Sequence, residues 1–294
     1  MNKELSRKYE KSLDELVRKW SAEDEVQGIV VYGSFLTAKM GRYSDLDLFI
    51  VKSGSDEMAS RVYLVGDELF NISVIGIEEF ESRLNVSCLG DLRMMLARYK
   101  ILFDRDAKLK PMLEQAAPCT SSEYDKYAIT LLFHFLLELG RAENFFDLGE
   151  TLDALHHSFH ACEHDLRLGL LEEQLPFDTD VFHAGLSVKP ELVTGIQDVM
   201  GNSNYDLALV SGFLDQLREE RDELLDKYAK TVLKYMPEQA TALSELKKQE
   251  VFSEAGYILF QSYVEHGRLE RVGVGQSVPG FDDIVAEEVA FRRK

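Results

Sequence analysis

Cysteine, proline, tryptophan and long apolar runs are all scarce in this chain, which has 3 Cys, 6 Pro and 1 Trp in 294 residues. The cysteines are odd in number and widely spaced, so neither a disulfide framework nor a zinc knuckle is expected. No apolar stretch approaches the ~20 residues that span a bilayer. The first residues are charged rather than an apolar signal core. We therefore predict a cytoplasmic protein with no membrane partner.

Positive charge is the other shortage, because the formal net charge is −19. Residues 1–115 carry 17 Lys and Arg against 20 Asp and Glu, whereas residues 116–294 carry 16 against 32. Such an acidic field repels phosphate backbones, so we expect no nucleic-acid partner. A cationic small molecule would be attracted to the acidic half. Solubility explains the same charge equally well.

Apolar periodicity separates a mixed part of the chain from a helical part. The mixed part, residues 1–117, has strand-like alternation in five places: 27–32, 46–52, 61–65, 69–75 and 99–104. Helical patterns in this part cover 2–20, begin at 77, and recur at 91–97 and 106–116. The prediction for residues 1–117 is a mixed-sheet domain.

Beyond the linker-like stretch at 118–122 the pattern is helical. One apolar stripe ends at Gly140, which we interpret as a helix C-cap. Further helices are expected at 152–170, 189–200, 205–235 and 239–264. The overall prediction is an α+β fold, with an all-α helical bundle at 118–266. Residues 267–294, rich in Gly and Pro, are predicted to form an irregular tail closing in a short amphipathic helix.

The strongest chemical pattern lies between the first two predicted strands. Gly33-Ser34 follows one apolar run, and Asp45-Leu46-Asp47 opens the next. Strand alternation places Asp45 and Asp47 on the same side. Paired carboxylates suit Mg²⁺, which proteins hold with one or two carboxylates plus substrate phosphates. Gly33 allows close approach of a ligand, and Ser34 adds a hydroxyl donor. The pattern predicts a site for a metal-bound triphosphate, although Asp45 could also simply belong to a hairpin turn.

With a serine, Ser44, directly before the first aspartate, this pattern resembles the signature of the nucleotidyltransferase superfamily, the DNA polymerase β-like fold. That signature is Gly-Ser, about ten residues, then Asp-x-Asp. The surrounding residues are similar to those of antibiotic nucleotidyltransferases of the lincosamide and aminoglycoside type. The resemblance implies transfer of a nucleoside monophosphate, AMP from ATP, to a hydroxyl of a small molecule, which the acidic charge suggests is cationic. It also implies that the helical bundle at 118–266 supplies part of the acceptor pocket.

The resemblance also implies roles for individual residues. Asp45 and Asp47 would be the catalytic Mg²⁺ ligands. The nucleotide and its phosphates would be bound by five residues of the motif and its loop: Gly33, Ser34, Lys39, Arg42 and Ser44. The two cations among them would neutralise the departing pyrophosphate, unless they are ordinary solvated loop charges.

One residue departs from the family pattern. A third carboxylate usually lies on a neighbouring strand, but here Asn71 occupies its place, and an amide cannot accept a proton. Glu68 or Asp67 from the adjacent turn is a candidate replacement. The helical part offers Glu138 and Glu143. Each of these acids could equally be a solvated surface residue.

Two further questions stay open from the sequence. His156, His160 and His164 follow i, i+4, i+8 spacing, which fits a cleft lining, a base, a transition-metal site or a plain polar helix face. The chain could also be a catalytically impaired nucleotide-binding or regulatory module, or an enzyme that nucleotidylates a protein. A homodimer is left open as its assembly.

Overall fold

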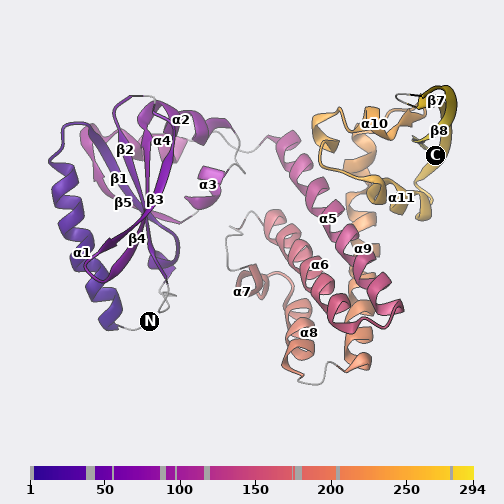
Figure 1. The fold of residues 1–294 in the computed structure, drawn as a ribbon, viewed down its shortest axis with the longest axis horizontal. Helices are drawn as coiled ribbons and strands as arrows, with labels where there is room; N and C mark the ends of the chain where they lie inside the picture. Colours follow the sequence, from indigo (N-terminus) through magenta and orange to yellow (C-terminus); the bar gives the residue numbers. More distant parts are fainter. Residues whose placement is uncertain are drawn as a thin grey trace. The chain divides into compact units, whose positions relative to one another are not determined.

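The computed structural model describes residues 3–37, 44–54, 56–86, 91–96, 98–115, 120–173, 175, 181–202, 206–278 and 281–294. The chain divides into two compact units, Met1–Thr120 and Ser121–Lys294 (Figure 1). No helix in the described ranges combines the length and the apolar character needed to cross a bilayer.

The N-terminal unit is built on a five-stranded mixed sheet, as the sequence predicts. Its strands are β1 (Val26–Tyr32), β2 (Leu46–Lys52), β3 (Ala59–Val65), β4 (Glu68–Gly76) and β5 (Tyr99–Asp104). Their order in the sheet is β3-β4-β2-β1-β5. Strands β2 and β4 run parallel, and the other neighbours are antiparallel.

Helices cover both faces of this sheet. They are α1 (Lys3–Ser21), α2 (Ile77–Val86), α3 (Asp91–Met95) and α4 (Leu109–Gln115), with 3₁₀ turns η1 (Gly33–Thr37) and η2 (Arg105–Ala107). Strand alternation sends one set of apolar residues toward α1 and the other toward α2, α3 and α4. The α1 face includes Tyr9, Leu13, Leu46, Leu48, Phe70 and Ile72. The opposite face includes Val30, Tyr32, Phe49, Ile75, Phe80, Leu84, Leu92 and Leu109.

The C-terminal unit is mainly helical, which confirms the predicted fold class. Its helices are α5 (Ser121–Asp147), α6 (Thr151–Glu172), α7 (Val181–Gly185), α8 (Pro190–Gly201), α9 (Leu207–Tyr235), α10 (Leu243–Leu246) and α11 (Tyr257–Glu265), with a 3₁₀ turn η3 (Glu250–Phe252). A small sheet of order β6-β8-β7 completes it, formed by β6 (Thr241–Ala242), β7 (Leu269–Val278) and β8 (Phe281–Arg293).

The predicted irregular tail with a closing helix is wrong. Residues of β7 and β8 pair antiparallel from Leu269 opposite Arg293 to Ser277 opposite Val285. Leu269 and Phe291 are fully buried, and the Phe291 ring stacks on that of Phe260 at 5.2 Å between centroids. The glycines in this stretch suggested a loop, but cross-strand pairing and packing on α11 outweigh local propensity.

Two helix boundaries also differ from the prediction. Gly140 lies inside α5 rather than at its end. Glycine is suited to this position because an added Cβ would lie only 3.2 Å from the side chain of Ile258 in α11. The helix expected over 239–264 is wrong: β6, α10 and η3 occupy most of this range, and α11 begins only after Gly256. A Cβ there would come within 2.6 Å of the Phe133 ring, so close packing selects glycine.

Candidate functional site

A single row of side chains crosses the sheet at the start of β2. The register pairs Val62 with Asn71, Asn71 with Asp47, Asp47 with Tyr32, and Tyr32 with Tyr99. Paired residues of neighbouring strands share a face, so all five side chains lie on the α2 side of the sheet. The motif therefore sits where the sequence predicted, at the beginning of a central strand.

Asp47 is the centre of this row. Its Oδ1 accepts a hydrogen bond from Asn71 Nδ2 at 3.0 Å. Its Oδ2 faces the backbone of Gly33, where an added Cβ would lie only 2.6 Å away. Gly33 also has φ +77°, a conformation that favours glycine. The carboxylate is thus held between the turn after β1 and the amide on β4.

The electrostatics of Asp47 are unusual for an aspartate. Burial raises its pKa to about 6, the Asn71 hydrogen bond opposes this shift, and the negative charge of Asp45 adds to it. In the part of the chain that the structure describes, no Lys or Arg forms an ion pair with either carboxylate. Two neighbouring carboxylates that no described Lys or Arg pairs with form a donor set that fits a hard divalent ion.

Tyr32 lies beside this donor set and was not predicted as a site residue. Its ring stacks on Phe49 with centroids 4.7 Å apart. Burial raises the pKa of its phenol to about 12, the charge of Asp47 adds to the shift, and a hydrogen bond with Ser73 opposes it. Ser73 is itself buried and its hydroxyl lies 2.6 Å from that of Ser60. Alternation from Asn71 along β4 points to Ser73, whereas Tyr32 comes beside Asp47 through the pairing of β1 with β2.

Tyr9 of α1 holds the end of the motif loop, a role that sequence reasoning missed. Its hydroxyl donates to the backbone oxygen of Ser44 at 2.8 Å. Burial raises the pKa of this phenol, a backbone hydrogen bond at Leu69 opposes the shift, and the charges of Glu68 and Asp45 add to it. The bond from α1 therefore holds the backbone directly before Asp45.

The other predicted nucleotide-binding residues are only partly described. Ser34 follows Gly33 in η1. Lys39 and Arg42 lie outside the described residues.

Glu68 is not brought to the carboxylate row. It is followed at alternating positions of β4 by Phe70 and Ile72, which both face α1. Its carboxylate accepts a hydrogen bond from Ser12 of α1 at 3.0 Å. Glu68 therefore lies on the sheet face opposite Asp47 and Asn71. Its position in the turn could not reveal this, because the face depends on the register of the hairpin.

Glu138 and Glu143 both belong to ion pairs in the C-terminal unit. Glu138 contacts His157 Nδ1 of α6 at 2.6 Å and Arg141 at 2.7 Å. Burial raises the pKa of Glu138, but its hydrogen bond to His157 and the charge of Arg141 outweigh burial, so the net shift is downward. Glu143 pairs with Arg218 of α9 at 2.8 Å. Both contacts join helices of the bundle.

The predicted histidine face consists of ring-to-ring contacts. His156 and His160 meet edge to face with centroids 4.6 Å apart, and His164 stacks on His134 at 5.2 Å. Burial lowers the pKa of His164 to about 4, with His134 and Arg167 adding to the shift. Within the described residues, no three His, Cys, Asp or Glu side chains are placed to hold a metal ion.

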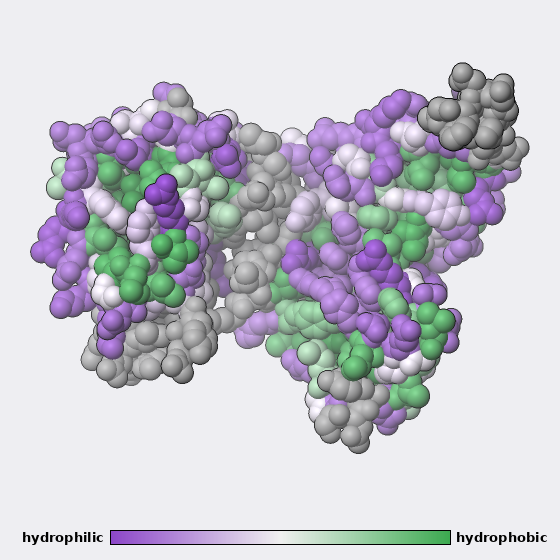
Figure 2. Space-filling view, in the orientation of Figure 1, coloured by the Kyte–Doolittle hydropathy of each residue, from purple (hydrophilic) through white to green (hydrophobic). Residues whose placement is uncertain are grey.

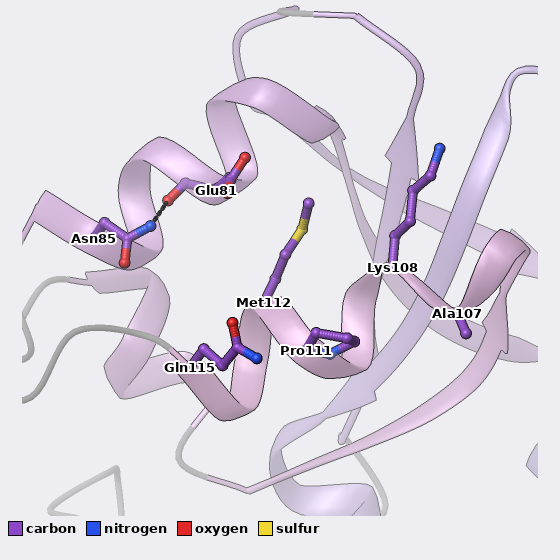
Figure 3. Close-up of a pocket in the computed structure, with 7 residues that line it drawn as sticks. All are labelled: Glu81, Asn85, Ala107, Lys108, Pro111, Met112 and Gln115. Carbon is purple, nitrogen blue, oxygen red and sulfur yellow. Dashed lines mark hydrogen bonds between the residues drawn. The ribbon is translucent and has the colours of Figure 1, made fainter.

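A separate pocket of about 430 Å³ opens between α2 and α4. Figure 3 shows Glu81 and Asn85 of α2 facing Met112 of α4, with Lys108 at the rim. Asn85 donates to the backbone oxygen of Glu81 at 3.0 Å. No described residue of the Gly33–Asp47 motif lines this pocket.

Comparison with known proteins relates the mixed-sheet unit and its carboxylate pair to nucleotidyltransferase domains. Residues 10–101 match the family model described as "Nucleotidyltransferase domain". Among solved structures, the chain is similar to a nucleotidyltransferase-like protein from Exiguobacterium sibiricum, with a TM-score of 0.59 and 18% identity over 97% of this chain and 99% of that one. This second likeness extends the shared fold to the helical unit. No curated protein matches the chain.

Proposed function

We propose that the N-terminal unit transfers a nucleoside monophosphate, AMP from ATP, to a hydroxyl group of a small molecule. The observation that carries the proposal is the position of Asp47. It lies beside Asp45, between the Gly33 turn and Asn71, and no described Lys or Arg is paired with it. The repulsion between two neighbouring carboxylates favours binding of a cation beside them.

Asp45 and Asp47 would hold Mg²⁺, which neutralises phosphate charge when it is bound. Gly33, Ser34 and Ser44 would bind the nucleotide phosphates, with Lys39 and Arg42 of the loop beside the departing group. The acceptor oxygen forms a bond to the α-phosphorus as the bond to the β-phosphate oxygen breaks, and pyrophosphate leaves with that electron pair. The hydroxyl proton passes to water or to a carboxylate.

Asn71 bears on where that proton goes. Its amide donates to Asp47, and an amide cannot take a proton from the acceptor. Glu68 lies on the other face of the sheet and is bonded to Ser12, so we do not assign it as the base. Glu138 remains the candidate from the helical unit, with its carboxylate already paired to His157.

The test is thermal stabilisation by ATP with and without Mg²⁺. A ligand at one hundred times its Kd stabilises the folded state by about 2.7 kcal/mol, a shift of several degrees in Tm. We expect stabilisation that requires Mg²⁺ and disappears in Asp45→Asn/Asp47→Asn. Asp67→Asn, which removes an exposed turn carboxylate, is the matched control and should keep the full shift. An equal shift in the double variant would place the nucleotide elsewhere.

A second candidate function is a nucleotide-binding module without transfer activity, and the Asn71 amide is the observation that favours it. Pyrophosphate release separates the two. Release that depends on a hydroxyl acceptor, a small molecule or a protein, supports the enzyme. Mg²⁺-dependent ATP binding without release, across small-molecule acceptors and cell-extract proteins, supports the module.

A further inference from the structure

Three exposed apolar side chains lie beside the carboxylate row. Val62 and Leu64 of β3 are 62% and 67% exposed, and Leu69 of β4 is 40% exposed. Val62 pairs with Asn71, and Leu64 pairs with Leu69, so all three share the sheet face of Asp47. We call these three residues the apolar strip. Figure 2 shows hydrophobic surface over β3 and β4 of the N-terminal unit.

This strip is not an extension of the core. Deeper along the same face, Phe49 and Val30 are fully buried under the α2 layer. On the strip, by contrast, two large aliphatic residues stand open on an edge strand. Edge strands ordinarily carry charge or proline at such positions, because open apolar edges promote unwanted association. An exposed apolar patch next to a polar site is typical of a binding surface.

The order of the strands decides on which side of Asp47 the apolar strip lies. In the order β3-β4-β2-β1-β5, the Gly33 turn follows β1 and lies on one side of Asp47. The strip lies on the other side, beyond Asn71. The two oxygens of Asp47 reflect this division, since Oδ2 faces Gly33 and Oδ1 faces Asn71.

Phosphoryl chemistry of the proposed kind needs the entering and leaving oxygens roughly in line, on opposite sides of the phosphorus. With the outer phosphates at Gly33 and Ser34, as the proposed function has it, pyrophosphate leaves on the β1 side. The acceptor must then enter over β4 and β3. The side chains that it meets there are Asn71 and the apolar strip.

We propose that the apolar strip is the acceptor subsite, and that the acceptor carries a hydrocarbon chain or ring next to its reacting hydroxyl. This inference rests on the proposed function and narrows its substrate class. None of the strip's side chains is charged, so on this side the acceptor is recognised by burial of apolar surface rather than by cationic charge. Asn71 adds a neutral polar group where the hydroxyl arrives.

The test compares two acceptor probes with identical ring hydroxyls, n-hexyl β-D-glucoside below its micelle concentration and methyl β-D-glucoside. Each is added to the full chain with Mn²⁺ and α,β-methylene-ATP. Broadening of the glucoside proton NMR signals by the paramagnetic Mn²⁺ then reports that the glucoside lies close to the ion. The variant is Val62→Ser/Leu64→Ser. Tyr63→Ser is the matched control, because Tyr63 is exposed on the same strand but points to the opposite face.

We expect hexyl protons to broaden with wild type and with Tyr63→Ser, and affinity to fall on the order of tenfold in Val62→Ser/Leu64→Ser and for the methyl probe. Equal broadening in the double variant, equal binding of the two probes, or no hexyl binding to wild type overturns the inference. Nucleotide binding is measured first, by thermal stabilisation without glucoside. Failure at that stage rejects the proposed function, and the acceptor subsite with it.

Discussion

Asp47 in the N-terminal unit and Asp165 in the C-terminal unit have the same direction of pKa shift but different partners. Burial raises the pKa of both. Asp165 is fully buried in α6, and its Oδ1 lies 2.6 Å from Nζ of Lys189, which also pairs with Glu220. Asp47 accepts a hydrogen bond from the neutral amide of Asn71, and no described Lys or Arg is paired with it.

The difference separates a structural charge cluster from a binding site. In the bundle, Lys189 is a built-in cation between two carboxylates, so that cluster needs no ligand. At the start of β2, no described Lys or Arg takes such a place beside the two carboxylates, and a proton or an added ion relieves their repulsion. The comparison gives three predictions, from the largest expected effect to the smallest.

Replacing the built-in cation should have the largest effect. Lys189→Met leaves the buried Asp165 and the half-buried Glu220 without compensation, so the free energy of unfolding should fall by about 3–5 kcal/mol, measured by chemical denaturation. Lys227→Met is the matched control, since Lys227 pairs with Glu172 at the surface and should cost no more than about 1 kcal/mol. Equal losses in the two variants would mean that the buried cluster is no different from a surface pair.

Removing the negative charge of Asp47 should instead raise the free energy of unfolding. The pKa of Asp47 is higher in the folded state than in the unfolded state. Its protonation therefore stabilises the fold at pH values below the unfolded pKa, and this stabilisation is lost as pH rises through about 6. Ionised Asp47 therefore destabilises the ligand-free protein above pH 6, and Asp47→Asn should raise its unfolding free energy at pH 8 by on the order of 1–3 kcal/mol. The gain should shrink by pH 5 and vanish below about pH 4.

Denaturation curves at these pH values, without Mg²⁺, measure this gain. Asp67→Asn should show no comparable pH-dependent gain, because Asp67 is exposed in the β3–β4 turn. A gain in Asp47→Asn that does not change with pH would contradict the assigned pKa.

The smallest effect concerns the turn that contacts Asp47. Gly33→Ala and Gly54→Ala both place a side chain at positive φ, 77° and 100°, which costs about 1 kcal/mol in each case. Only Gly33 has a neighbour, Asp47 Oδ2, whereas a Cβ at Gly54 meets nothing within 4 Å. We expect Gly33→Ala also to weaken Mg²⁺-dependent ATP stabilisation, with Gly54→Ala retaining it. Equal ATP shifts in the two variants would remove Gly33 from the site.

Local sequence patterns predicted most of the N-terminal unit. The five strands lie within a few residues of their expected positions, and the Asp45–Asp47 pair opens β2 as expected. These features depend on side-chain alternation and on turn residues, which act over a few neighbouring positions. The β7–β8 hairpin was missed because its stability depends on pairing and packing, which local glycine content does not reveal.

The sequence by itself determined the motif, its spacing and the mixed sheet that carries it, because these are encoded in periodicity within short segments. Tertiary structure alone decided which side chains meet. The parallel register of β2 and β4 placed Asn71 on Asp47, and the hairpin register turned Glu68 to the α1 face. Register joins segments distant in the chain, and a shift of one residue exchanges the two faces of a strand. The partner of Asp47, and with it the charge of the site, is therefore a property of the folded sheet.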